Sequence, residues 1–228
     1  MYGVIFNTLQ KRKHVIDYSK DDIPSKETVN DILWHAWKTT PSKQNMMPYQ
    51  ISVYGPEHEK AKDAAWSKVA GNHHAYEVYG TKKGRIKEPS YAINPYYSHI
   101  QNTPWLLIFQ HRVCTYTSPF YEKQIERGHY MEQMYRDEVV GSRVVSFEAG
   151  LFASNVTAMC LEKDIDVSYC GCWPYLSSEW EDVPGVNENL IILMTLGKGS
   201  YYRRQRLEEQ NQSHLDYKTA YEDIVKFI

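Results

Sequence analysis

Residues 142–163 read SRVVSFEAGLFASNVTAMCLEK, a stretch rich in apolar side chains. In an α-helix these side chains would lie around most of the circumference instead of along one stripe, so the helix has to be covered on most sides. One sheet of the same chain cannot cover all of them. We therefore expect a buried helix that also contributes to the interface of a homodimer.

The segments before and after this stretch alternate between helical and extended patterns. A helix is predicted between Ser25, which can cap its first turn, and Pro41, which ends it. Its buried face is expected to carry Val29, Ile32, Leu33, Ala36 and Trp37. The patterns also predict a half-exposed strand over 49–54, a helix from Pro56 to Val69, a central strand over 105–109, and strands over 167–169 and 190–196.

Helices that alternate irregularly with a few apolar strands indicate an α+β architecture, and 228 residues suit a single domain over 1–228. Residues 71–97 combine glycines, prolines and tyrosines without sustained periodicity, so they are expected to form a long excursion or lid. From about residue 198 to residue 228 the chain is first polar and basic, then amphipathic.

The composition narrows the class of protein. Acidic and basic residues nearly cancel, leaving a formal charge of -2, so the chain lacks the basic excess of a nucleic-acid-binding protein. No window approaches the ~20 consecutive apolar residues of a membrane span, and the first residues lack the apolar region of a signal peptide. Four cysteines are too few to hold a chain of this length together by disulfides. We expect a cytoplasmic protein with reduced thiols and no nucleic-acid or membrane partner.

Four segments of the chain, in this order, resemble signatures of the nitroreductase family. The first is Arg12–Ile16, and the second is the loop PSKQNMMPY at 41–49, which is the strongest match. The third is the apolar helix with Glu148 and Asn155, followed by Ile165–Trp173, and the fourth is RQRL at 204–207. Their order and spacing over most of the chain carry the resemblance, since each motif alone is weak.

The resemblance implies a fold, a cofactor and an assembly. The fold would be a three-layer sandwich in which helices flank a central, mostly antiparallel sheet. The assembly would be an intertwined homodimer that binds FMN between its subunits. The C-terminal segment at about 198–228 would wrap the partner subunit.

The resemblance also implies which residues bind FMN. They are Arg12, Lys13, His14, Pro41, Ser42, Lys43, Asn45, Glu148, Tyr169, Cys170, Gly171, Arg204 and Arg206. The phosphate dianion needs charge-assisted hydrogen bonds, which arginine supplies best. The loop 41–45 would reach the flavin ring from the second subunit, and the segment 169–171 would offer backbone amides to flavin N5.

Each of these assignments competes with a simpler interpretation. Basic side chains most often form a solvated face, and Ser42 and Asn45 could only satisfy turn geometry. The C-x-C pair at 170–172 could bind a metal or act as a redox dithiol, although structural zinc sites use longer spacings and a second pair.

Two positions depart from the family pattern. His14 stands where a hydroxyl residue is usual, and Ile16 stands where a lysine or arginine usually lies near flavin N1. A cation near N1 favours hydride acceptance, because the reduced flavin tends to carry negative charge there. Lys13, Lys43 or Arg112 could take over that role.

These expectations lead to one function and two alternatives. The first is an FMN-dependent oxidoreductase that transfers hydride from NADH or NADPH through flavin N5 to an aromatic acceptor, such as a nitro compound or a quinone, by a ping-pong mechanism. No side chain need be a catalytic residue, since the cofactor carries the chemistry. One alternative is a specialised relative, either a reductive dehalogenase or an enzyme that consumes the flavin, with 71–97 as a lid over its substrate. The other is a flavin-binding protein without turnover.

Overall fold

The computed structural model describes residues 4–42, 45, 47–69, 100, 102–112, 123, 126–127, 138–171, 173, 176–209, 211 and 221–226, without the side chains of 4–6, 138–142, 206 and 222. The predicted lid at 71–97 and the predicted FMN ligand Lys43 lie outside the described residues, as do Cys114 and Cys172. In chain order the described elements are α1 (Val4–Gln10), β1 (Val15–Tyr18), α2 (Lys26–Thr39), β2 (Tyr49–Tyr54), α3 (Glu59–Lys68), β3 (Trp105–His111), α8 (Glu138–Glu162), β4 (Asp166–Cys170), η2 (Ser177–Glu179), β5 (Leu190–Gly197), β6 (Gly199–Tyr202), α9 (Arg203–Glu209) and α10 (Tyr221–Ile224).

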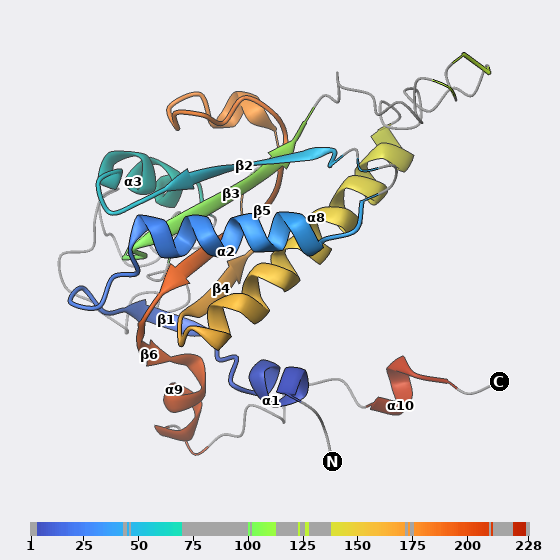
Figure 1. Ribbon diagram of the computed structural model, residues 1–228. Coiled ribbons are helices and arrows are strands. Elements are labelled where there is room, and N and C mark those ends of the chain that lie inside the picture. The colour runs from blue at the N-terminus through green and yellow to red at the C-terminus, as the bar shows by residue number, and fades with distance from the viewer. Residues whose placement is uncertain are drawn as a thin grey trace.

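A four-stranded sheet forms the middle layer of the domain (Figure 1). Its strand order is β2-β3-β5-β4, and every neighbouring pair is antiparallel. The strand predicted at 105–109 is central and fully buried, as its unbroken apolar sequence requires. Because side chains alternate along a strand, β3 sends Trp105, Leu107 and Phe109 to one face and Leu106 and Ile108 to the other.

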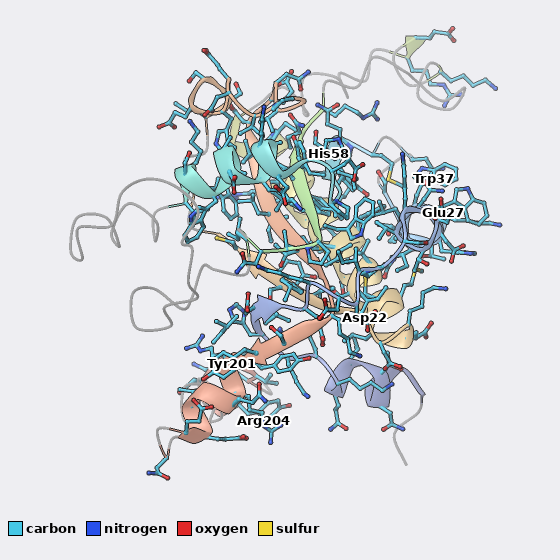
Figure 2. The ribbon with its side chains drawn as sticks, turned by 90° about the vertical axis from the view of Figure 1, so that its left-hand side faces the viewer. Asp22, Glu27, Trp37, His58, Tyr201 and Arg204 are labelled. Carbon is cyan, nitrogen blue, oxygen red and sulfur yellow. The ribbon has the colours of Figure 1, made fainter. Side chains whose placement is uncertain are left out.

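Helices α2 and α8 cover the first face of this sheet (Figure 1). Ser25 caps α2 as predicted, because its hydroxyl oxygen accepts from the Thr28 amide at 3.2 Å. Val29, Ile32 and Ala36 are buried, but the prediction that Trp37 joins them is wrong: Trp37 is 56% exposed and points outward in Figure 2. At 100° per residue, Trp37 lies about 100° from Ala36 around the helix, at the margin of the buried stripe.

Helix α8 begins at Glu138, four residues before the predicted start. One stripe is buried against α2 and the sheet, and it carries Val145, Ala149, Phe152, Val156 and Cys160. Phe147 is 67% exposed, so this chain alone leaves part of the apolar circumference uncovered. By length and composition the stretch Arg143–Glu162 could span a membrane, but its packing within the domain accounts for its buried apolar side.

Helix α3 and the segment 180–190 cover the second face of the sheet. The helix starts at Glu59 instead of Pro56, since residues 56–57 form a turn. Trp66 from α3 and Trp180 are both fully buried against Leu106 and Ile108. The two helical layers and the sheet between them confirm the three-layer α+β sandwich.

A second, two-stranded sheet joins the two ends of the chain, and sequence patterns did not predict it. Strand β1 pairs with β6 antiparallel, with Val15 opposite Tyr202. The Val15 amide donates to Ser168 Oγ at 2.8 Å, which ties β1 to β4 of the larger sheet. Both strands have four residues, too few for a reliable period of two.

Candidate functional site

Positively charged side chains gather where β1, β6 and α9 meet. Arg12, Lys13 and His14 lie between α1 and β1, and Arg203 opens α9 directly after β6. The Arg203 amide donates to the His14 carbonyl oxygen at 2.9 Å, so the two segments are held together. We call Arg12, Lys13, His14 and Arg203 the cationic cluster, in which Arg12, Lys13 and Arg203 carry the positive charge.

His14 is enclosed by two of these cations. Its side chain is half-buried, and burial, Arg203 and Arg12, in this order, lower its pKa from 6.5 to about 4. The imidazole is therefore neutral at pH 7. The positive charges of Arg12 and Arg203 both act on His14. Two positive charges near the same residue suit a bound dianion such as a phosphate group.

The family resemblance implies Arg204 and Arg206 as phosphate ligands, whereas the charge that acts on His14 in the structure is that of Arg203. The Arg204 side chain is exposed, and its Nε donates to Glu208 Oε1 at 2.9 Å. Figure 2 shows Arg204 near Tyr201 at the end of the molecule formed by β6 and α9. The side chain of Arg206 is outside the described residues. Treating 203–206 as one basic run would have included Arg203.

The cation expected near flavin N1 is still a prediction. Ile16 is fully buried in β1, so this position contributes an apolar core side chain. The Lys13 ammonium lies 4.7 Å from the centroid of the Tyr202 ring. Arg112 Nε donates to the Met47 carbonyl oxygen at 2.9 Å and thereby supports the loop before β2.

The loop between α2 and β2 is fixed by hydrogen bonds that connect it through Ser42 to α8. The Ser42 hydroxyl donates to Glu148 Oε2 at 2.6 Å and accepts from the Met47 amide at 2.8 Å. Glu148 is buried, so it anchors the loop from within the domain. Asn45 and Met47 have φ angles of 58° and 46°, in the left-handed region that asparagine tolerates better than most residues.

A second contact fixes the end of α2 where this loop begins. Asn155 Nδ2, from α8, donates to Thr40 Oγ1 at 2.9 Å. Glu148 and Asn155 are the two polar residues of the third signature. Both hold in place the loop that contains Ser42 and Asn45. Asn45 is exposed on this loop.

A cleft of about 530 Å³ opens between this loop and the first half of α8. The residues around it are Pro41, Ser42, Arg143, Val144, Phe147, Glu148 and Leu151. Its surface is mostly apolar, with Arg143 exposed and Glu148 buried. Such a surface can accept a flat apolar group or the side chains of a second subunit.

The three predicted site residues at the end of β4, 169–171, differ in the direction and the exposure of their side chains. The Tyr169 hydroxyl donates to the Ala153 carbonyl oxygen at 3.0 Å and is hydrogen bonded to Thr157, so its side chain faces α8. The positive charge of Arg12 acts on Tyr169, which places this residue near the cationic cluster. The Cys170 side chain is buried on the opposite face of the sheet, whereas Gly171 is exposed. The segment can therefore offer backbone at Gly171 but not the Cys170 thiol.

The predicted site residues thus form two groups within one chain. Figure 1 places the junction of β1, β6 and α9 near the end of α8 that leads into β4, and the loop after α2 beside the first half of α8. The first group contains Arg12, Lys13 and His14, with Tyr169 nearby. The second contains Pro41, Ser42, Asn45 and Glu148.

Comparison with known proteins identifies the family of the chain. The sequence profile of the Nitroreductase family matches residues 9–198. No curated protein matches the chain in sequence. Residues 9–198 include the cationic segment 12–14, the loop after α2 and all strands of the four-stranded sheet.

Solved structures share the fold at low sequence identity. A candidate nitroreductase from Exiguobacterium sibiricum, in complex with FMN, has 13% identity and a TM-score of 0.64, with 100% of this chain and 99% of that chain covered. A candidate NAD(P)H:FMN oxidoreductase from Staphylococcus epidermidis has 15% identity and a TM-score of 0.63, with coverage of 100% and 97%. A candidate nitroreductase from Desulfovibrio desulfuricans, also in complex with FMN, has 10% identity and a TM-score of 0.61, with coverage of 100% and 98%. With the family profile matched over most of its length, the chain belongs to the nitroreductase family.

Proposed function

We propose that this chain is an FMN-dependent oxidoreductase that takes its electrons from NADH or NADPH and works as a homodimer in the cytoplasm. The observation that carries the proposal is the cationic cluster, because a family member that binds FMN has to compensate the phosphate dianion. When bound, FMN supplies the centre that accepts hydride and passes electrons to an aromatic compound such as a nitro compound or a quinone.

The residues present fit the phosphate end of FMN. Arg12 and Arg203 each offer several guanidinium donors, and the charges of both act on His14. Their two permanent positive charges equal the two negative charges of a phosphate group, so the dianion would be bound with its charge compensated. Basic side chains on a solvated face are mobile. In this cluster the backbone of Arg203 is held by its hydrogen bond to His14, which suits the binding of a phosphate group better.

The second group of residues fits the ring end of a flavin in a dimer. The loop with Ser42 and Asn45 is anchored by Glu148, so it can present Asn45 in a fixed orientation. Beside the loop, Phe147 and Leu151 offer an apolar surface that this chain leaves uncovered. A second copy of the chain that covered this surface would place the anchored loop next to the partner's flavin.

The visible spectrum and the mass of the purified protein test the proposal together. We expect a yellow dimer whose flavin is bleached by NADH or NADPH and recovers its colour when a nitroaromatic compound or a quinone is added. Bound FMN that neither donor bleaches would instead support a flavin-binding protein without turnover. A monomer that retains FMN would contradict the dimeric site, and a protein that binds no added FMN would contradict the proposal as a whole.

The segment at the end of β4 gives a more specific prediction. Gly171→Val should slow flavin reduction by NAD(P)H more than tenfold, because a branched side chain would hold the backbone away from the flavin ring. A Cβ atom at this position would lie 3.7 Å from the Trp173 ring, an ordinary contact. A loss of reduction in a variant that keeps the parental melting temperature would therefore report on the bound flavin.

The matched control is replacement of both Cys170 and Cys172 by alanine. If the segment contributes only backbone groups, this variant should keep FMN and reduce it within about tenfold of the parent, a barrier change of ~1.4 kcal/mol. Stopped-flow bleaching of the flavin compares the variants. Loss of reduction in the cysteine variant, together with parental rates in the valine variant, would assign the chemistry to the thiols instead.

A further inference from the structure

A buried hydroxyl group connects β1 to the four-stranded sheet. Ser168 of β4 is fully buried, and its Oγ accepts from the Val15 amide at 2.8 Å and donates to the Val15 carbonyl oxygen at 3.3 Å. A serine hydroxyl has one hydrogen to donate and lone pairs that accept, so this one side chain bonds both backbone groups of Val15. The carbonyl oxygen of His14, the residue before Val15, accepts from the Arg203 amide. The segment 12–14 is therefore held between α9 and β4.

The other end of β1 is bonded to the cross-strand neighbour of Ser168. Thr195 lies opposite Ser168 in the β4–β5 ladder. The Tyr18 hydroxyl, from the last residue of β1, is hydrogen bonded to Thr195 Oγ1 at 2.8 Å and to the Thr195 carbonyl oxygen at 3.2 Å. All three hydroxyl side chains are buried, so a hydrogen bond lost here leaves a buried polar group unsatisfied. The sheet thus fixes β1 at its first and at its last residue.

Ser168 lies between the two segments that the proposed function assigns to opposite ends of FMN. Val15, its hydrogen-bonding partner, directly follows the segment 12–14 at the phosphate end. In its own strand Ser168 directly precedes 169–171, the segment expected beside the flavin ring. FMN has to reach both segments at once, so the distance between them determines whether its ring and its phosphate group can bind together.

We propose that Ser168 is a positioning residue of the FMN site, whose hydroxyl group sets the distance between the segments 12–14 and 169–171. The inference rests on the proposed function and adds to it a residue that acts through both segments. Without the hydroxyl group, the Val15 amide and carbonyl oxygen lose their partner in the core, and β1 shifts to regain hydrogen bonds. The two segments then no longer match the length of FMN, whereas a ligand without the phosphate group is affected less.

The direct test compares the affinities for FMN and riboflavin in the parent and in Ser168→Ala, measured by quenching of flavin fluorescence. FMN affinity should fall at least about tenfold, because a displacement of about 1 Å between binding groups is enough for an effect of this size. Riboflavin lacks the phosphate group, and its affinity should fall less than about threefold. A merely structural role would weaken both ligands equally and leave the ratio of the two affinities unchanged.

Thr103→Val is the matched control variant. The Thr103 hydroxyl is also buried, and it donates to the carbonyl oxygens of Trp105 at 2.7 Å and Leu196 at 3.3 Å, away from both segments. This variant should lower the melting temperature, as Ser168→Ala does, but keep FMN affinity within about threefold of the parent.

Hydrogen exchange, followed by nuclear magnetic resonance, tests the link in the parent protein without any substitution. The Val15 amide should exchange faster than the Leu107 amide of the central strand β3, because β1 belongs to a two-stranded sheet. FMN, which would engage both segments, should slow exchange at Val15 more than at Leu107, whereas riboflavin should slow both to the same extent.

Three results would overturn this inference alone. They are parental FMN affinity in Ser168→Ala, an equal loss of affinity for FMN and riboflavin in that variant, and equal slowing of the Val15 and Leu107 amides by FMN. Absence of FMN binding in the parent protein would contradict the proposed function as well.

Discussion

Replacing Arg12 and Arg203 together by alanine is expected to weaken FMN binding about a thousandfold. Each guanidinium group would contribute charge-assisted hydrogen bonds worth about 2 kcal/mol, and each 1.4 kcal/mol corresponds to about a factor of ten in affinity. Alanine at 203 keeps the backbone amide that donates to the His14 carbonyl oxygen. The variant should therefore fold, and fluorescence titration with FMN can measure its loss of affinity.

Arg204→Ala is the matched control for this experiment. Arg204 is the neighbouring residue in α9, but its side chain is exposed and paired with Glu208, so its removal should change FMN affinity less than about threefold. An Arg204→Ala variant that loses more affinity than Arg203→Ala would restore the assignment that the family motif suggested. Parental affinity in the double variant would remove the cationic cluster from the site.

Replacing Gln110 by leucine is expected to destabilise the fold by about 3 to 5 kcal/mol. Gln110 is fully buried in β3, and both ends of its amide are used. Its Nε2 donates to the Gly185 carbonyl oxygen at 2.7 Å and to Ser52 Oγ at 2.9 Å. Its Oε1 accepts from the amides of Asn187 and Glu188, each at 3.0 Å. Leucine has a similar volume but leaves the amides of Asn187 and Glu188 without their acceptor, whereas the Gly185 carbonyl oxygen keeps its hydrogen bond from Ser52 Oγ at 2.7 Å. Urea unfolding would measure the cost.

Gln50→Leu provides the comparison. Gln50 lies directly opposite Gln110 in the β2–β3 ladder, but its side chain makes an exposed hydrogen bond to Asn187. Its removal should change the free energy of unfolding by less than about 1 kcal/mol. Equal destabilisation by the two substitutions would show that strand position, and not the buried amide, determines stability here.

Sequence patterns predicted the elements that bury a regular apolar face. Helix α2 and strand β2 were found because their apolar residues repeat with the period of a helix or a strand, and strands β3 and β5 because they are unbroken apolar runs. Trp37 was misplaced because a residue about 100° from the centre of a stripe can lie inside or outside the core, depending on what packs against it. Strands β1 and β6 were not predicted. Each is too short to show a period, and each is stabilised by pairing with the other, which is distant in sequence.

The candidate site was predictable to the level of segments but not of single side chains. The motifs located the segment 12–14, the loop after α2 and the basic run after β6. A motif cannot say which residue of a basic run lies next to the segment 12–14. In the structure this residue is Arg203, whose amide donates to the His14 carbonyl oxygen. The burial of Glu148 and its bond to Ser42 are tertiary contacts between residues far apart in sequence, so no local pattern could assign Glu148 as an anchor of the loop.

The pairing of β1 with β6 has a consequence for biosynthesis. The proposed phosphate site needs Arg12 and His14 from the start of the chain and Arg203 from near its end, and the pairing of Val15 with Tyr202 brings them together. Contacts of such long sequence separation form late, because almost the entire chain has to be closed into a loop first. A nascent chain therefore acquires the complete phosphate site only after β6 and the start of α9 have left the ribosome, when the rest of the sheet has already been synthesised. Binding of FMN should accordingly occur after translation, and bound FMN should indicate that the domain has folded completely.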